Sequence, residues 1–327
     1  MSLLDFYDSL LLDLDGTVWE GGRAIPHAVE TLTASSLNTI YITNNASRAP
    51  EDVAKRLQTI GLEVTDKQVL TSAQSAVSLV RESYPAGTKV LIVGSESFRD
   101  LARAAELEVV DSADENPEVV LHGHNPETDW AVLSEAAYAL HAGATYIASN
   151  LDTTLPTERG LAVGNGSLVA ALVSATGVRP AAAGKPQPTM LQQAAKVLGA
   201  QRPLAVGDRL DTDIEGGNAA KMPTFHVLTG VSGPIALLEA PAEQRPTYIA
   251  QDLRDLHRRP EELVPGAQGG FTARVDGADV LLERGDDAAD PLAALRTVLE
   301  VAWSLRRPPE LIRPMSAAAE KAASAWW

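Results

Sequence analysis

Leu11-Leu12-Asp13-Leu14-Asp15-Gly16-Thr17, near the beginning of the chain, is the most informative stretch of the sequence. Its leucines belong to an apolar run that predicts a buried strand, and two carboxylates follow at the carboxyl end of that strand. Because side chains alternate along a strand, Asp13 and Asp15 lie on the same side of the backbone, and Gly16 lets the chain turn away. Two carboxylates this close repel each other unless a cation or an acid–base task separates their roles. The stretch therefore indicates a nucleophilic carboxylate beside a proton-donating one with a metal ion between them. The alternative is a strand end with two solvated aspartates.

Composition and charge exclude several classes of protein. The chain has 327 residues, enough for two domains, with 45% hydrophobic and 21% charged residues as in ordinary globular proteins. The net charge of −16 argues against nucleic acid or an anionic membrane as the main partner. Cysteine is absent, which excludes disulfides, thiolate metal sites and cysteine catalysis. We see no signal peptide, and no apolar run reaches the roughly 18 residues of a membrane span, so we expect a cytoplasmic protein without membrane insertion.

Short apolar runs alternate with helical patterns, which predicts a parallel α/β fold. The clearest runs are Thr39–Ile42, Val90–Val93, Val119–Leu121, Tyr146–Ala148 and Leu204–Val206. Pro50 and the acids after it are typical of a first helical turn. Near Arg258 the pattern changes to a stretch rich in Pro and Gly, which indicates a linker. A hairpin around Asp276-Gly277 and a helix over 291–305 are expected after it.

Polar side chains follow three of these runs at the point where each strand ends. They are Asp13 and Asp15, Thr43 and Asn44, and Asp208. Because the carboxyl ends of parallel strands share one edge of a sheet, where ligands bind, we expect these side chains to form one site. Lys185 adds a cation just before a helical stretch, and Asp213 adds a carboxylate after Asp208. Taken singly, these features are also typical of a strand-to-helix turn, a surface lysine and an ordinary loop, but their joint occurrence in this order favours a single site.

This set of residues fits phosphoryl transfer to a carboxylate. Asp13 is expected to attack phosphorus and form an aspartyl-phosphate. Asp15 is expected to protonate the leaving alkoxide and then to activate the water that hydrolyses the intermediate. Thr43, Asn44 and Lys185 are expected to hold the phosphoryl oxygens, on which charge spreads in the transition state.

The same residues predict one divalent cation per site. Its expected ligands are the carboxylates of Asp13 and Asp208 and the main-chain carbonyl of Asp15. Ligands that are all oxygen, together with a phosphate substrate, favour Mg²⁺ over Zn²⁺. Asp213 is expected just outside the ligands, as an acceptor that orients a water on the cation or the Lys185 ammonium.

Taken in order, Asp13–Thr17, Thr43–Asn45, Lys185 and Gly207–Ile214 resemble the four motifs of the haloacid-dehalogenase-like hydrolases. The resemblance covers about residues 5–255 and is to the phosphatase branch, which includes 4-nitrophenyl-phosphatase and the phosphoglycolate and pyridoxal-phosphate phosphatases. It implies that Asn45 also belongs to the phosphate-binding motif. A dehalogenase of the superfamily would lack a counterpart of Asp15, so that residue supports phosphate chemistry.

The long interval between Thr43 and Lys185 resembles relatives that carry an α/β cap between the second and third motifs. The fold expected from this is α/β, with a doubly wound parallel-sheet core of Rossmann type, an inserted α/β cap and a small α+β extension. The predicted boundaries are 1–69 and 181–257 for the core, 70–180 for the cap and 258–327 for the carboxy-terminal extension. The resemblance implies that the cap closes over the core and limits the size of the substrate.

Two segments that follow strands of the cap are candidates for substrate specificity, because the corresponding family segments lie near the site. Relatives often have an aromatic residue and Asp where His124 and Asn125 stand, so their substrate preferences are not transferred. A capping or packing role is the alternative for His122 and His124. The specificity candidates are His124, Asn125, Glu127, Asn150 and Asp152.

The extension resembles that of the actinobacterial glycerol 3-phosphate phosphatases, which carry a remnant acetyltransferase-like segment. Residues 258–327 show no basic, Gly-rich cradle for acetyl-CoA. We expect Trp303, Trp326 and Trp327 either to pack on the chain's own core or to form an interface.

The resemblance implies a Mg²⁺-dependent phosphomonoester hydrolase whose best substrate is glycerol 3-phosphate. The alternatives are hydrolysis of phosphoglycolate, pyridoxal phosphate or nucleotide monophosphates and, from another class, a non-catalytic metabolite-binding module. The expected partner is a small phosphorylated metabolite. A homodimer is left open, because cap-mediated dimers occur in the family.

Overall fold

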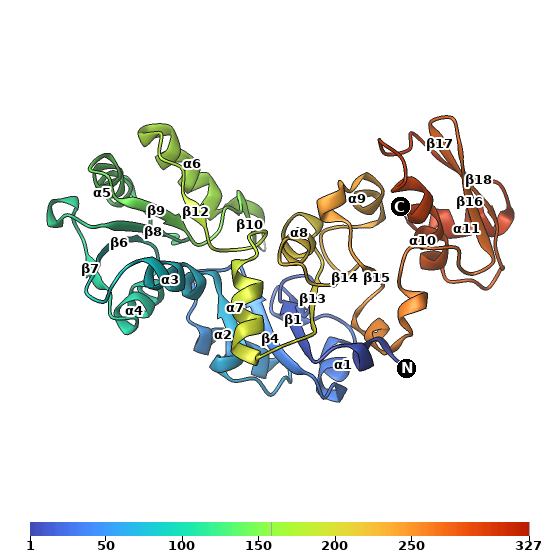
Figure 1. Ribbon diagram of the computed structural model, residues 1–327, viewed down its shortest axis with the longest axis horizontal. Coiled ribbons are helices and arrows are strands. Elements are labelled where there is room, and N and C mark those ends of the chain that lie inside the picture. Colours follow the sequence, from blue (N-terminus) through green and yellow to red (C-terminus); the bar gives the residue numbers. More distant parts are fainter. Residues whose placement is uncertain (158, 327) are drawn as a thin grey trace. The chain divides into compact units, whose positions relative to one another are not determined.

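The computed structural model describes residues 1–157 and 159–326, so Glu158 and Trp327 lie outside the described residues. The chain forms two compact units (Figure 1). The first unit comprises Met1–Thr39 and Leu198–Trp327, and the second unit comprises Ile40–Val197.

The first unit contains four parallel strands in the spatial order β15-β14-β13-β1. Their bounds are β1 (Ser9–Asp13), β13 (Pro203–Gly207), β14 (Thr224–Val227) and β15 (Tyr248–Ala250). The leucines of β1 are fully buried, as the apolar run predicts, and Leu12 lies opposite Val206 of β13. This register brings the ends of β1 and β13 level with each other. The small hairpin β2 (Trp19–Glu20) and β3 (Arg23–Ala24) and the helices α1 (Ala28–Ala34), α8 (Glu215–Ala219) and α9 (Pro234–Glu239) complete this part.

The second unit begins within β4 (Asn38–Thr43), which pairs in parallel with β5 (Val69–Thr71); α2 (Pro50–Thr59) connects these two strands. A separate parallel sheet follows, with the strand order β12-β9-β8-β6-β7. Its strands are β6 (Lys89–Val93), β7 (Glu108–Val110), β8 (Val119–His122), β9 (Thr145–Ala148) and β12 (Ala181–Ala182). An antiparallel hairpin, β10 (Thr154–Thr157) and β11 (Gly160–Val163), lies between β9 and α6 in the chain.

Helices cover both faces of this five-stranded sheet. One apolar cluster joins the sheet to α3 (Ser72–Ser83) and α4 (Glu96–Ala104), and another joins it to α5 (Trp130–His141) and α6 (Asn165–Thr176). Figure 1 shows these two helix pairs on opposite sides of the strands. The helix α7 (Thr189–Leu198) follows β12. Helices on both faces explain why the strands are nearly continuous apolar runs.

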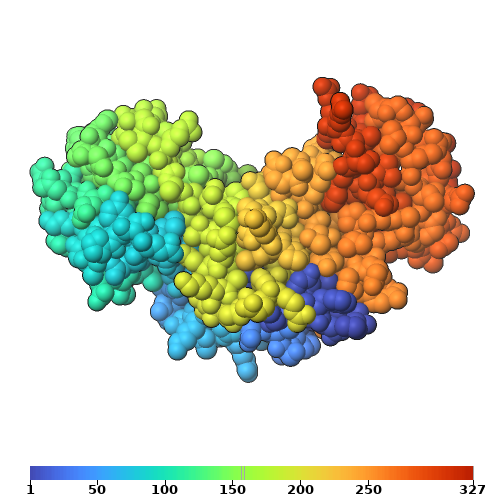
Figure 2. All heavy atoms as spheres, viewed as in Figure 1, coloured from blue at the N-terminus to red at the C-terminus, as the bar shows by residue number. Residues whose placement is uncertain are grey.

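The carboxy-terminal segment of the first unit forms the predicted hairpin and helix. Strands β16 (Phe271–Asp276) and β17 (Asp279–Arg284) are antiparallel, β18 (Ile312–Pro314) pairs with β17 in parallel, and the helices are α10 (Pro291–Ala302) and α11 (Ala317–Ser324). The apolar face of α10 shares one buried cluster with α9 and with Ile249 of β15. Figure 2 shows the surface of this segment in orange to red.

Two tryptophans of the extension pack on their own unit. The Trp303 indole N–H donates to the Leu237 carbonyl at 2.9 Å, and the Trp326 indole N–H donates to the Pro291 carbonyl at 3.2 Å. Trp326 is only 5% exposed. Packing on the chain's own core is therefore the correct alternative for these two residues.

The segment predicted as a linker is packed rather than free. Leu263 is fully buried, and its carbonyl accepts a hydrogen bond from the Ile249 N–H of the edge strand β15 at 2.9 Å. Pro and Gly indicate turns, and the turns of this part of the chain cover a sheet edge; that it acts as a linker between core and extension stays a prediction.

The predicted fold class is confirmed: the chain is α/β with a parallel core sheet, an inserted parallel sheet and a small mixed sheet at the carboxy terminus. The boundaries drawn between core, cap and extension stay a prediction. None of the helices in the described residues has the length and apolar character needed to cross a membrane.

Candidate active site

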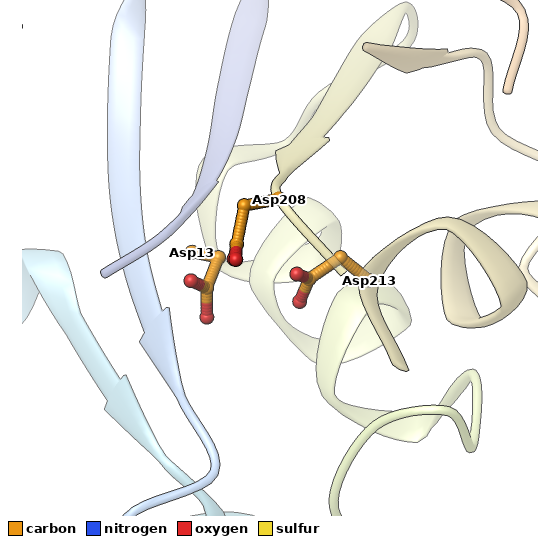
Figure 3. A group of neighbouring side chains, drawn as sticks. All are labelled: Asp13, Asp208 and Asp213. Atoms are coloured by element: carbon orange, nitrogen blue, oxygen red, sulfur yellow. The ribbon is translucent and has the colours of Figure 1, made fainter. Parts of the chain in front are cut away.

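Three carboxylates of the first unit point toward one another (Figure 3). Asp13 is the last residue of β1, Asp208 directly follows β13, and Asp213 lies in a π-helical turn over Leu210–Ile214. Each offers one carboxylate oxygen, and these oxygens all lie within 4.8 Å of one another. Asp208 is fully buried, and Asp213 is 5% exposed. The strand-end prediction for Asp13 and Asp208 is confirmed.

Three glycines let the backbone close around these carboxylates. A Cβ on Gly16, whose φ is +85°, would lie 2.5 Å from Asp208 Oδ2, and a Cβ on Gly230 would lie 2.0 Å from the same atom. A Cβ on Gly207 would lie 2.3 Å from the Asp213 Cβ. No other residue type fits such contacts without displacing a carboxylate.

The donor set fits a hard divalent cation. The cluster offers only oxygen atoms, which are the ligands that Mg²⁺ prefers, and a cation would offset the mutual repulsion of three clustered carboxylates, of which Asp208 and Asp213 are buried. The structure groups the carboxylate of Asp213 with those of Asp13 and Asp208. Its predicted place just outside the ligands, and the predicted ligand role of the Asp15 carbonyl, stay predictions.

Asp15 lies two residues after Asp13 in the chain and is exposed. Its carboxylate accepts a hydrogen bond from the indole N–H of Trp19 at 2.9 Å, and the two residues also form a backbone bridge. This contact orients the carboxylate next to the tight turn at Gly16. An exposed, oriented carboxyl group is able to exchange protons with solvent, which its predicted acid–base role requires.

The segment Thr229–Ser232, which was not among the predicted site residues, encloses Asp208. The Val231 N–H donates to Asp208 Oδ2 at 2.6 Å, and the Thr229 hydroxyl donates to the Gly16 carbonyl at 2.6 Å. Ser232 is bound on both sides, because its N–H donates to the Asp208 carbonyl and its Oγ accepts from the Leu210 N–H. The available signal was a Thr-Gly pair after the strand β14, at the sheet edge that carries the other site residues.

His226 binds the segment Thr229–Ser232 through a hydrogen bond. It is fully buried in β14, and its Nε2 donates to the Ser232 carbonyl at 2.9 Å. Burial lowers the pKa of the imidazole to about 4, so the ring is neutral at physiological pH. A neutral ring places no further charge beside the carboxylates.

The second unit holds the predicted phosphate-binding residues. Thr43 ends β4 and is buried, and its Oγ1 accepts a hydrogen bond from the Asn45 N–H at 3.1 Å. The Asn45 Oδ1 accepts from the N–H and the hydroxyl of Ser47, which is a local turn. Lys185 is only 4% exposed, so the alternative of a surface lysine is excluded. Asn44 bonds to the Lys185 main chain through its side chain.

The five predicted specificity residues also lie in the second unit. Asn125 is bound to the end of β6, because its Nδ2 donates to the Gly94 carbonyl at 3.2 Å. The neighbouring His124 is partly buried, which lowers the pKa of its imidazole, and Glu127 is exposed. Asn150 and Asp152 both bond to Asn44. Their roles in specificity stay predictions.

Family models match both sequence segments that carry the motifs. A model described as haloacid dehalogenase-like hydrolase matches residues 10–108, and a related HAD-hydrolase-like model matches residues 182–256.

Full-length relatives agree with these matches. The chain is 42% identical to the D-glycerol 3-phosphate phosphatase of Mycobacterium tuberculosis over 93% of its own length and 88% of the relative. It is 32% identical to the acid sugar phosphatase of Staphylococcus saprophyticus over 78% of its own length and 99% of the relative.

Solved structures share the fold. The glycerol phosphate phosphatase of M. tuberculosis in complex with magnesium superposes with a TM-score of 0.96 at 41% identity, covering 100% of this chain and 98% of that one. The p-nitrophenyl phosphatase of Archaeoglobus fulgidus gives a TM-score of 0.70 at 31% identity, covering 76% and 98%. With its cluster of Asp13, Asp208 and Asp213 suited to Mg²⁺, the chain belongs to the haloacid dehalogenase-like hydrolases and is a phosphatase of that family.

Proposed function

We propose that this phosphatase hydrolyses glycerol 3-phosphate or a similar short polyol phosphate. The observation that carries the chemistry is the cluster of Asp13, Asp208 and Asp213 at the end of the parallel strands. The substrate is supported by the 42% identical relative from M. tuberculosis, which is named for glycerol 3-phosphate. Acid sugar phosphatases at 32–33% identity make sugar phosphates the second class to test.

In the proposed reaction, a carboxylate oxygen of Asp13 attacks phosphorus while the bond to the ester oxygen breaks. Asp15 donates its proton to that oxygen, and the alcohol leaves. Asp15 then accepts a proton from water, whose oxygen attacks the phosphorus of the aspartyl-phosphate, so that inorganic phosphate is released and the Asp13 carboxylate is restored. Thr43 and Lys185 bind phosphoryl oxygens, with Asn45 in the same motif. Mg²⁺, when bound by the acidic cluster, offsets the negative charge of phosphate and carboxylates.

Phosphate release from a panel of esters tests this proposal. The panel contains glycerol 3-phosphate, phosphoglycolate, pyridoxal phosphate, a hexose phosphate and a nucleotide monophosphate, each with Mg²⁺ and with EDTA. We expect release to require the cation and to be fastest with glycerol 3-phosphate. Faster release from another ester would overturn the substrate assignment, and no release from any of them would favour the binding-module alternative.

A cytoplasmic location, which rests on the sequence features described above, and a homodimer, which rests on the family resemblance, are further proposals. Cell fractionation and light scattering of the purified protein test them. A single-chain mass in solution would contradict the dimer.

A further inference from the structure

Asn44 and Asp152 make contacts that point to a role other than binding substrate. Asn44 directly follows β4, and Asp152 lies in the loop between β9 and β10. Lys185 is far from both in the sequence, yet all three residues are joined by hydrogen bonds within the second unit.

The Asn44 side chain holds the main chain of Lys185. Its Oδ1 accepts from the Lys185 N–H at 2.9 Å, and its Nδ2 donates to the Lys185 carbonyl at 3.0 Å. Gly184 allows this approach, since a Cβ there would lie 2.7 Å from Asn44 Oδ1. Two hydrogen bonds to one residue fix both the position and the orientation of its backbone. Asn44 therefore determines the point from which the Lys185 side chain extends.

The remaining hydrogen-bonding capacity of Asn44 is directed to the loop around Asp152. Its Nδ2 also donates to the Asp152 carboxylate, at 3.2 Å and 3.3 Å to the two oxygens. Its main-chain carbonyl accepts from the Asn150 amide at 2.7 Å and from the Ser72 hydroxyl. A side-chain amide has two N–H donors and one oxygen, so the Asn44 amide is occupied by these contacts.

The loop at Asp152 is in turn fixed to the start of α6. The Gly166 N–H donates to the Asp152 carbonyl at 2.8 Å, and the Asn165 amide donates to the Asn150 carbonyl at 2.8 Å. A Cβ on Gly166 would lie 2.1 Å from the Leu151 carbonyl oxygen, so the two segments are in close contact. Two residues after Asp152 the chain enters the hairpin β10–β11. Any displacement of α6 or of this hairpin therefore displaces Asp152.

We propose that Asn44 and Asp152 are positioning residues that couple the loop before the hairpin β10–β11 to the backbone of Lys185. Asp152 orients the Asn44 amide so that its oxygen faces the Lys185 N–H, and the amide then holds the lysine in place. The functional part of this inference rests on the proposed function, in which Lys185 binds the phosphoryl group.

The test compares Asp152→Ala and Asp152→Asn with the control Asp114→Asn, which alters an exposed carboxylate of the same unit. Hydrogen exchange of the Lys185 amide reports on its hydrogen bond to Asn44. The values of kcat and KM with 4-nitrophenyl phosphate report on the effect of that hydrogen bond on catalysis. In Asp152→Ala we expect the Lys185 amide to exchange about tenfold faster and kcat to fall about tenfold, with KM changed less. Asp152→Asn keeps an acceptor oxygen and should restore most of both values.

Wild-type exchange of the Lys185 amide in Asp152→Ala would overturn the proposal. Equal losses in Asp152→Ala and Asp152→Asn would overturn it too, because an amide oxygen can replace the carboxylate as acceptor. Hydrogen exchange needs no substrate. An enzyme that releases no phosphate would therefore refute the proposed function, while the exchange data would still decide whether Asp152 holds Lys185 in place.

Discussion

Two charged sites of the first unit, the acidic cluster at the sheet edge and Arg296 in the extension, differ in how their charge is compensated. At the sheet edge the unit gathers Asp13, Asp208 and Asp213, three groups of like charge. In the extension it buries Arg296, which is 0% exposed and lies in the middle of α10. Like charges held together cost folding free energy unless a cation binds, whereas the Arg296 guanidinium finds an acceptor within the protein itself.

Arg296 donates from two of its nitrogens to the protein's own backbone, while its buried Nη1 has no hydrogen-bond partner among the described residues. Its Nε donates to the Ile249 carbonyl at 2.9 Å, and its Nη2 donates to the same oxygen. Ile249 belongs to the edge strand β15, so the guanidinium covers a carbonyl that would otherwise lack a strand neighbour. Burial lowers the pKa of Arg296 to about 10, and the group therefore stays charged at neutral pH.

The surroundings of Arg296 balance its charge. Arg258 forms ion pairs with Asp255 at 3.7 Å, Glu262 at 3.2 Å and Asp290 at 3.3 Å. These acids favour the charged form of Arg296, while Arg258 opposes it. The contrast with the acidic cluster is that opposite charges alternate here, so no bound cation is needed to offset them.

Asp13→Asn tests the acidic side of this comparison and should have the largest effect. Loss of the nucleophile should lower phosphate release by at least about 10³-fold. Relief of like-charge repulsion should at the same time raise the free energy of unfolding in EDTA, by about 1 kcal/mol. Activity assays and urea unfolding measure the two quantities.

The matched control is Asp287→Asn, which removes an exposed carboxylate of the same unit. It should leave activity and stability unchanged. If Asp13→Asn retained activity, the nucleophile assignment would be wrong, and if it lost stability in EDTA, the cluster would not be a repulsive one.

Arg296→Ala tests the structural side. The variant leaves the Ile249 carbonyl without its donor and creates a cavity in a fully buried position, so the free energy of unfolding should fall by about 3 kcal/mol. Arg296→Met keeps most of the volume and removes the charge, and its cost should be smaller. Urea unfolding of both variants distinguishes packing from hydrogen bonding. Equal stability of Arg296→Ala and wild type would show that the guanidinium is not a structural element.

Sequence patterns predicted the acidic cluster better than Arg296, for physical reasons. Asp13 and Asp208 follow apolar strands, and the rule for parallel sheet edges brings such residues together. An arginine inside an amphipathic helix is expected on the solvent face, and only the edge strand that it covers explains its burial. Lys185 was predicted from the sequence, but the hydrogen bonds from Asn44 to its main chain join distant parts of the chain and could not be predicted from a local pattern.

His122 of the second unit is a buried ionisable group that, unlike the acidic cluster and Arg296, is uncharged at neutral pH. It ends β8, is 0% exposed, and its Nδ1 lies 2.8 Å from the Tyr146 hydroxyl. Burial lowers the pKa of its imidazole to about 3. The unfolded chain therefore binds a proton below about pH 6.5 that the folded chain does not, and stability falls with falling pH by about 1.4 kcal/mol per unit, or about 2 kcal/mol at pH 5.

Urea midpoints at pH 7.5 and pH 5 measure this loss. His122→Gln should remove this contribution to the pH dependence, while the buried His226 keeps its own. His141→Gln alters an exposed imidazole at the end of α5 and should behave as wild type. An unchanged pH dependence in His122→Gln would mean that the imidazole is hydrated in the folded protein.

Thr229→Val should give the smallest effect. It tests whether Mg²⁺ binding by the acidic cluster depends on a neighbouring hydrogen bond. The substitution keeps the shape of the side chain but removes the hydroxyl that donates to the Gly16 carbonyl at 2.6 Å. The expected cost is about 1 kcal/mol, or about fivefold in Mg²⁺ affinity measured by calorimetry. Thr229→Ser keeps the hydroxyl and should bind the cation as wild type does. If the valine variant bound Mg²⁺ as tightly as the wild type, the three glycines and the Val231 N–H would be sufficient to hold the carboxylates. The acidic cluster would then not depend on the Thr229 hydroxyl.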